Sequence, residues 1–146
     1  MAKMTAAMPW TSFIDTNVLV YADSGDEPVR QARALSLLAE HRRQGTGVLS
    51  TQVLQEFASV ALRKLRLPPA LVRDRLGFYA RFDVVAASPA LIADALDLHA
   101  LRGVSFYDAL IVQAAIAGGC AQLLTEDMQS GAVFGGVRIV NPFAAV

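Results

Sequence analysis

The sequence predicts an α/β fold in which helices cover both faces of a parallel sheet. Short apolar runs that are typical of strands alternate with longer segments whose apolar residues recur at helical spacing. This alternation favours parallel strands, because a helix can carry the chain back to the start of the next strand. The 146 residues correspond to one domain, which at this size needs no disulfide or metal ion to fold.

Capping residues and helix breakers set the boundaries of the expected elements. Ser50 or Thr51 caps the third helix, Ser88 and Pro89 open the fifth, and Gly103 ends it. The expected elements are a strand at 11–15, helices at about 16–21 and 28–43, a strand at 48–49, helices at 51–67 and 69–81, a strand at 82–85, helices at 89–101 and 105–118, and strands at 121–124 and 137–140.

The composition predicts a cytoplasmic protein with an apolar interface. Hydrophobic residues make up 54% of the chain, and the mean hydropathy is +0.40. The longest uncharged stretch, residues 109–125, is interrupted by glutamines and a glycine pair, so we expect no membrane span. No signal peptide is visible, and the single cysteine, Cys120, fits a reducing compartment.

The apolar excess predicts contact with another protein chain. The helices at 16–21 and 51–67 are the expected contact surfaces, and residues 1–10 are expected to form a flexible tail. The side chains expected at the contacts are Val18, Leu19, Tyr21, Leu54, Phe57 and Ala61.

A neutral total charge hides a basic segment and an acidic remainder. The chain has 13 basic and 13 acidic residues, yet residues 30–81 hold ten basic and three acidic ones. Such a segment can follow a phosphate backbone, although solvation of a helix is the simpler role for any single arginine. The residues expected to contact nucleic acid cluster at helix ends, and they are Arg42, Arg43, Arg63, Lys64 and Arg66.

Four acidic residues from four segments are candidates for a site. Asp15 ends the first expected strand and Asp127 lies in the loop after the fourth, where parallel sheets bind ligands. Glu56 and Asp108 lie on helices. Taken singly, each has a simpler role: three fit helix ends, and Glu56 fits a solvated helix flank. We call Asp15, Glu56, Asp108 and Asp127 the four acids.

Gathered together, the four acids predict a metal centre. Clustered carboxylates repel one another without a cation, and oxygen ligands without Cys or His suit Mg²⁺ or Mn²⁺. Such ions activate water and neutralise phosphoryl oxygens during hydrolysis, whether one ion or two is bound. Neighbouring polar side chains would orient the acids, and these are Thr16, Asn17, Ser105 and Thr125.

Other chemistries find little support in the sequence. No glycine-rich phosphate-binding loop and no nucleophile elbow is present, and His41 and His99 each lie inside an expected helix. A phosphoacceptor switch of the receiver type needs a lysine near a late strand, whereas Lys3 and Lys64 are both early in the chain.

Four short motifs in this order resemble the PIN-domain nucleases, and within them the toxin subunit of VapBC toxin–antitoxin pairs. The similarity extends from about residue 12 to 143, and it includes an Asn-Pro-Phe segment at 141–143. The motifs are Phe13-Ile14-Asp15-Thr16-Asn17, Gln55-Glu56-Phe57, Ser105-Phe106-Tyr107-Asp108-Ala109-Leu110-Ile111 and Leu123-Leu124-Thr125-Glu126-Asp127-Met128.

The resemblance implies a three-layer α/β/α sandwich with a central parallel sheet of about five strands, in one PIN-like nuclease domain at 11–146. It implies that the four acids bind Mg²⁺ or Mn²⁺ in an endoribonuclease, with Asp127 preferred to Glu126 because the family pattern is Thr-x-Asp. It also implies an RNA substrate, a homodimer and an antitoxin that covers the active site. A catalytically idle scaffold and a solitary RNA-processing nuclease remain the alternatives.

Overall fold

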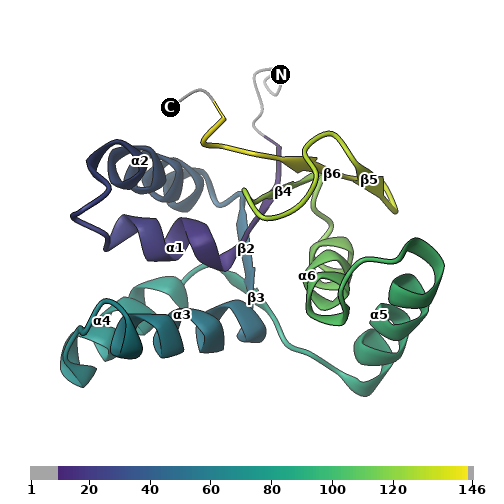
Figure 1. Ribbon diagram of the computed structural model, residues 1–146, viewed down its shortest axis with the longest axis horizontal. Coiled ribbons are helices and arrows are strands. Elements are labelled where there is room, and N and C mark those ends of the chain that lie inside the picture. Colours follow the sequence, from purple (N-terminus) through teal and green to yellow (C-terminus); the bar gives the residue numbers. More distant parts are fainter. Residues whose placement is uncertain (1–9, 145–146) are drawn as a thin grey trace.

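The computed structural model describes residues 10–144, which form one six-stranded sheet with helices on both sides (Figure 1). The predicted tail therefore lies, apart from Trp10, outside the described residues. The strands are β1 (Ser12–Ile14), β2 (Gly47–Ser50), β3 (Asp83–Val85), β4 (Gln122–Leu124), β5 (Val133–Phe134) and β6 (Val137–Val140). The helices are α1 (Thr16–Ala22), α2 (Pro28–Gln44), α3 (Thr51–Arg63), α4 (Pro69–Tyr79), α5 (Pro89–Arg102) and α6 (Phe106–Ala117).

The predicted parallel sheet is confirmed. The strand order is β3-β2-β1-β4-β6-β5, and every neighbouring pair is parallel except β5 with β6. Strand β5 was not predicted, because a two-residue strand has no periodicity to detect. From β1 the chain adds β2 and β3 on one side and β4 on the other, so β1 and β4 flank the topological switch point.

The three-layer arrangement is also confirmed. Figure 1 shows α1 to α4 on one side of the sheet and α5 with α6 on the other. Within residues 10–144 no single helix is long and apolar enough to cross a membrane. Helices α5 and α6 reach that length and apolar character only when taken together, and they are bent by 119° relative to each other.

The expected contact surfaces on α1 and α3 are wrong for most of their side chains. Val18, Leu19, Phe57 and Ala61 are each 0% exposed and belong to the core of the molecule. The cause is that α1 packs against both α2 and α3, so its apolar stripe is buried within the chain itself. Leu54 and Tyr21 are partly buried against the same core.

Candidate active site

The site begins where β1 and β4 end side by side. Ile14 pairs with Leu124 in the parallel register, and the backbone N–H of Asp15 donates to the Leu124 carbonyl at 3.1 Å. The next residues, Asp15 and Thr125, are therefore neighbours at the carboxyl edge of the sheet. The Thr125 hydroxyl donates to Asp15 Oδ2 at 2.8 Å.

Asp15 is a buried carboxyl group with two roles. Its Oδ1 accepts from the Thr16 N–H at 2.7 Å, so it caps α1 as its position after a strand suggested. Capping does not require burial, yet the residue is only 7% exposed. The pKa of Asp15 is raised to about 6. Burial is the main cause, the charges of Glu56 and Asp127 act in the same direction, and hydrogen bonds from Thr16 and Thr125 oppose the shift.

Glu56 is held by α1 and by its own helix. Its Oε1 accepts from the Thr16 hydroxyl at 2.7 Å, and its Oε2 accepts from Gln52 Nε2 at 3.1 Å. It is therefore an oriented, half-buried carboxylate and not a solvated flank of α3. Gln52 was missed from the sequence, where its position four residues before Glu56 on one helical face was the available signal.

Asp108 lies in the first turn of α6, where it is half-buried. Its backbone N–H donates to the Ser105 hydroxyl at 3.1 Å, so Ser105 caps the helix and presents this acid. Burial raises the pKa of Asp108, a hydrogen bond with Ser105 lowers it, and the charges of Asp127 and Glu56 raise it. Two acids from other segments therefore act electrostatically on the Asp108 carboxyl group.

Asn17 and Thr125 hold Asp127 at the mouth of the site. The Asn17 amide donates to Asp127 Oδ2 at 3.0 Å and to Thr125 Oγ1 at 3.1 Å. The Asp127 N–H also donates to Thr125 Oγ1 at 3.1 Å. Among the described residues, the Asn17 Oδ1 atom is buried without a hydrogen-bond partner, which leaves one acceptor free beside the acids.

The adjacent acid, Glu126, is used for a different purpose. The Tyr21 hydroxyl donates to Glu126 Oε1, and Arg30 Nε lies 3.5 Å from Glu126 Oε2. The hydrogen bond to Glu126 raises the pKa of Tyr21 to about 12. Glu126 therefore ties the loop after β4 to α1 and α2, while Asp127 faces the other acids. Sequence reasoning missed Tyr21 and Arg30 as its partners.

The donor chemistry of the site fits a hard divalent cation. The charges of Glu56 and Asp127 raise the pKa values of Asp15 and Asp108, and the causes of these two shifts include no basic side chain. A bound cation would offset the repulsion between the carboxylates. Carboxylate oxygens are also the ligands that Mg²⁺ and similar ions prefer. In residues 10–144, however, no group of three or more acidic, His or Cys side chains is close enough to hold a metal ion as the side chains stand.

The predicted basic residues divide between two edges of the molecule. Lys64 lines an open trough of about 540 Å³ together with Thr16, Asn17 and Asp127. Arg63 and Arg66 flank Lys64 in sequence and are exposed.

Arg42 and Arg43 lie at the end of α2, away from the acids, and their contact with nucleic acid stays a prediction. Helix α2 runs back to the start of β2, and Arg42 lines a hollow with Gly47 and Asp83, the first residues of β2 and β3. The amino ends of parallel strands lie at the opposite edge from their carboxyl ends, where the four acids are.

The four acids all lie within the part of the chain that matches a known family. The model of the PIN domain family matches residues 12–130. The chain belongs to the PIN domain family. No match was found among curated protein sequences.

Solved structures share the same fold. A toxin–antitoxin complex from Klebsiella pneumoniae is 18% identical with a TM-score of 0.67, covering 90% of this chain and 98% of that one. VapC20 from Mycobacterium tuberculosis, a sarcin–ricin loop cleaving toxin, is 18% identical with a TM-score of 0.63, covering 77% and 86%. VapBC2 from Rickettsia felis, bound to a promoter DNA fragment, is 20% identical with a TM-score of 0.61, covering 88% and 96%. At this identity, the likeness shows a shared PIN fold.

Proposed function

We propose that this PIN domain protein is a metal-dependent endoribonuclease that acts as the toxin of a toxin–antitoxin pair. The observation that carries the proposal is that Glu56 and Asp127 both act electrostatically on Asp15 and on Asp108, so that acids from four separate segments influence one another near the carboxyl ends of β1 and β4. The raised pKa values of Asp15 and Asp108 support it, since a separate structural role for each acid would not require Glu56 and Asp127 to lie near both of them. The toxins named among the structural neighbours point the same way.

The four acids would hold Mg²⁺ or Mn²⁺, which when bound supplies an activated water and neutralises the scissile phosphate. Asp15 provides a buried carboxylate whose two oxygens are aimed by Thr16 and Thr125. Thr16 also fixes Glu56, so α1 orients two of the acids at once. Asn17 and Thr125 restrain Asp127 from the loop side, so little side-chain entropy remains to be lost when a ligand binds.

RNA is the substrate that the charge distribution favours. Lys64 lines the trough that reaches Asp127, and Arg63 and Arg66 lie at the same end of α3. Positive charge there would attract the phosphate backbone toward acids that otherwise repel it. These contacts bind phosphate without reading sequence.

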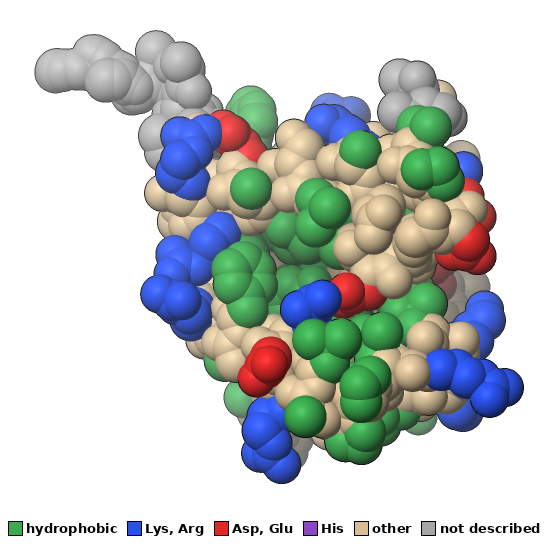
Figure 2. All heavy atoms as spheres, turned by 90° about the vertical axis from the view of Figure 1, so that its left-hand side faces the viewer, with side chains coloured by type: hydrophobic (Ala, Val, Ile, Leu, Met, Phe, Trp, Pro, Cys, Tyr) green, Lys and Arg blue, Asp and Glu red, His purple; other side chains and the backbone are tan. Residues whose placement is uncertain are grey.

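An antitoxin is the proposed protein partner. Figure 2 shows a hollow lined by hydrophobic side chains, in which an acidic and a basic side chain meet. A hollow of about 370 Å³ between α1, α2 and α4 is lined by the exposed Leu35 and Phe78, with the Arg75–Asp23 ion pair at 2.9 Å. An apolar antitoxin segment would bury these side chains and cover the face beside the trough.

We also propose that the chain forms a homodimer. Helix α5 exposes three large apolar side chains that nothing in residues 10–144 covers, and a second copy would bury them. They are Ile92, Leu96 and Leu101. Light scattering should report a dimer at micromolar concentration, and Leu96→Asp should shift it to the monomer.

The decisive experiment is cleavage of single-stranded RNA by the purified chain with Mg²⁺ or Mn²⁺ and with a chelator. We expect turnover only with metal, and its loss in Asp108→Asn, because the amide keeps the shape of the side chain and loses the charge. The matched control is Asp97→Asn, which removes an exposed carboxylate from α5. RNA binding without turnover would support a catalytically idle scaffold. If Asp108→Asn fails to fold, the role of Asp108 is to stabilise the end of its helix and not to bind metal.

The solitary-nuclease alternative is separated by genome context. A small upstream reading frame with a DNA-binding N-terminus would favour the toxin assignment, and copurification of its product would test the partner.

A further inference from the structure

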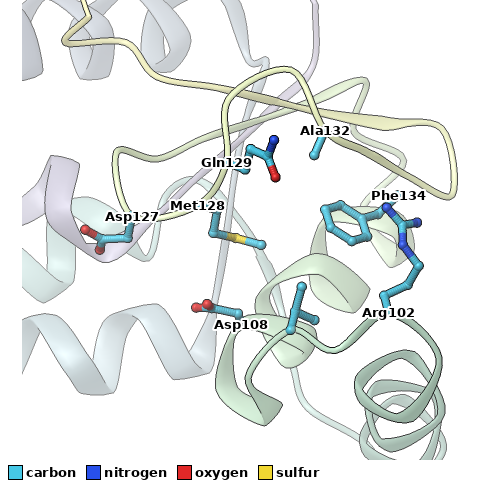
Figure 3. A pocket seen from close by; sticks show the side chains of 8 residues that line it. Arg102, Asp108, Asp127, Met128, Gln129, Ala132 and Phe134 are labelled. Atoms are coloured by element: carbon cyan, nitrogen blue, oxygen red, sulfur yellow. The ribbon is translucent and has the colours of Figure 1, made fainter.

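A second hollow adjoins the acids on the side away from Lys64. It has a volume of about 310 Å³. Figure 3 shows Asp108 and Asp127 at one end, Phe134 with Arg102 at the other, and Met128 between them. The lining residues are Arg102, Val104, Asp108, Asp127, Met128, Gln129, Ala132 and Phe134.

We propose that this hollow is a nucleotide subsite for single-stranded RNA, in which Arg102 binds the backbone phosphate next to the scissile one. The inference rests on the proposed ribonuclease function and names the residues that would select and anchor its substrate. It concerns Arg102, Met128 and Gln129, none of which belongs to the four acids or to their polar neighbours.

Arg102 is held in place before any ligand arrives. Its guanidinium carbon lies 4.2 Å from the centroid of the Phe134 ring, and its Nη1 donates to the Val133 carbonyl at 3.3 Å. Phe134 is only 5% exposed, so the platform under the guanidinium is fixed in the core. A planar, pre-positioned fork loses little side-chain entropy when it binds a phosphate.

The charge of Arg102 has no acidic partner in the described part of the chain. The ion pairs found between residues 10 and 144 involve Arg30, Arg43 and Arg75. An exposed arginine at the rim of a pocket, with only one donor engaged by the protein, is suited to an anionic ligand.

The wall between Arg102 and the acids suits a nucleobase. Val104, Met128 and Ala132 are partly buried and pack against the core, so they present a firm apolar surface. A thioether is polarizable and contacts aromatic rings favourably, and bases of single-stranded RNA are free to leave their stack and enter such pockets. Gln129 is exposed at the rim and offers an amide donor and acceptor to a base edge.

The two hollows meet at one lining residue. Asp127 lines both the Lys64 trough and the Arg102 pocket. A single RNA strand can therefore approach along Lys64, place one phosphate at the acids and place the next at Arg102. Along the RNA strand, the protein would then present Lys64, the four acids and Arg102 in turn. This order puts the metal-binding acids at the phosphate to be cleaved.

The test compares Arg102→Ala with Arg81→Ala, which removes an exposed arginine from the far edge of the sheet. We expect Arg102→Ala to raise KM for a single-stranded oligoribonucleotide roughly tenfold or more, as loss of a charged hydrogen bond does, with a smaller effect on kcat. The log–log salt dependence of binding should flatten by about 0.7, the value for one bound phosphate. Arg102→Lys should recover the slope but only part of the affinity, because it cannot stack on Phe134 in the same way.

The base pocket is tested separately with an oligonucleotide pool that is randomised around the cleaved bond. Met128→Ala and Gln129→Ala should change the base preference at one position beside that bond, and circular dichroism checks that each variant is folded. Equal behaviour of Arg102→Ala and Arg81→Ala in KM and salt slope, or an unaltered base preference, overturns the subsite.

Failure of the subsite can be distinguished from failure of the proposed ribonuclease function. If the wild-type chain cleaves no RNA with either metal, the nuclease proposal fails, and fluorescence anisotropy with labelled single-stranded RNA still decides the subsite. Weaker binding by Arg102→Ala than by Arg81→Ala supports an RNA subsite, whereas equal RNA affinity overturns it and leaves the pocket to a protein partner.

Discussion

Two adjacent acids, Glu126 and Asp127, have different hydrogen-bond partners and therefore different roles at this site. Glu126 accepts a hydrogen bond from Tyr21 and lies 3.5 Å from Arg30 Nε, whereas the Asp127 side chain accepts, among the described residues, only from the neutral Asn17 amide. Glu126 therefore anchors the loop after β4, and Asp127 keeps a charge available to a cation. The preference for Asp127, which came from a family pattern, acquires a physical reason in these contacts.

This division predicts that the Tyr21 hydroxyl positions Asp127 through its neighbour. Tyr21→Phe should lower the free energy of unfolding by about 1–2 kcal/mol, since it leaves a partly buried carboxylate one hydrogen bond short. It should also lower kcat for RNA more than it raises KM. Urea denaturation and steady-state kinetics measure the two effects.

The control for the hydroxyl is Tyr107→Phe, because the side chain of Tyr107 is 66% exposed. Its stability should be unchanged. Equal stability and kcat in wild type and Tyr21→Phe would mean that the loop holds Asp127 without Glu126.

At the scale of elements, the turn between α2 and β2 depends on a buried histidine. His41 Nδ1 and Thr46 Oγ1 are 2.7 Å apart, and the Thr46 N–H donates to the His41 carbonyl at 3.1 Å. Burial lowers the pKa of His41, while hydrogen bonding by Thr46 and the charge of Glu40 raise it. The folded state therefore favours the neutral ring.

The sign of the pH effect follows from this shift. The unfolded chain binds a proton on His41 more readily than the folded one, so the stabilisation is present above about pH 6.5 and is lost as the pH falls. Thermal melts at pH 7.5 and 5.5 should show a smaller loss of Tm in His41→Asn than in wild type. Parallel losses would contradict the burial effect.

Replacing two glycines with alanine should change the free energy of unfolding in opposite directions, because only one of them has room for a Cβ atom. A Cβ at Gly47 would lie 2.7 Å from the ring of Phe82, which is buried, so Gly47→Ala should cost about 1–3 kcal/mol. A Cβ at Gly77 in α4 meets nothing within 4 Å, so Gly77→Ala should stabilise by about 0.5–1 kcal/mol. Chemical denaturation measures both, and a stable Gly47→Ala would show that Phe82 can move aside.

At the scale of the whole molecule, the fold sorts the basic residues by edge. Replacing Arg63 and Lys64 with alanine should weaken RNA binding and flatten its log–log salt dependence by about 0.7 for each phosphate that is no longer bound. Replacing Arg42 and Arg43 removes the same charge from the opposite edge and should leave both quantities nearly unchanged. Filter binding at several salt concentrations compares the pairs, and equal effects would mean that net charge alone attracts RNA.

The sequence by itself determined most of the local structure and supplied the four candidate acids. Apolar runs, serine caps and left-handed glycines after helices are signals that act within a few residues, so the strands, helices and parallel sheet were predictable. The placement of Asp15 and Asp127 after strands was predictable for the same reason, because an apolar strand shows where it ends.

Only the tertiary structure decided which polar groups meet. Thr125 reaches Asp15 across 110 positions and Thr16 reaches Glu56 across 40, so these contacts exist only once β1 and β4 become neighbours and α1 packs on α3. The same packing buried the stripes on α1 and α3, moved Arg42 and Arg43 to the far edge, and placed Arg102 on Phe134. Hydrogen bonds and burial depend on distances in space, and sequence spacing reports such distances only within a single helix or strand.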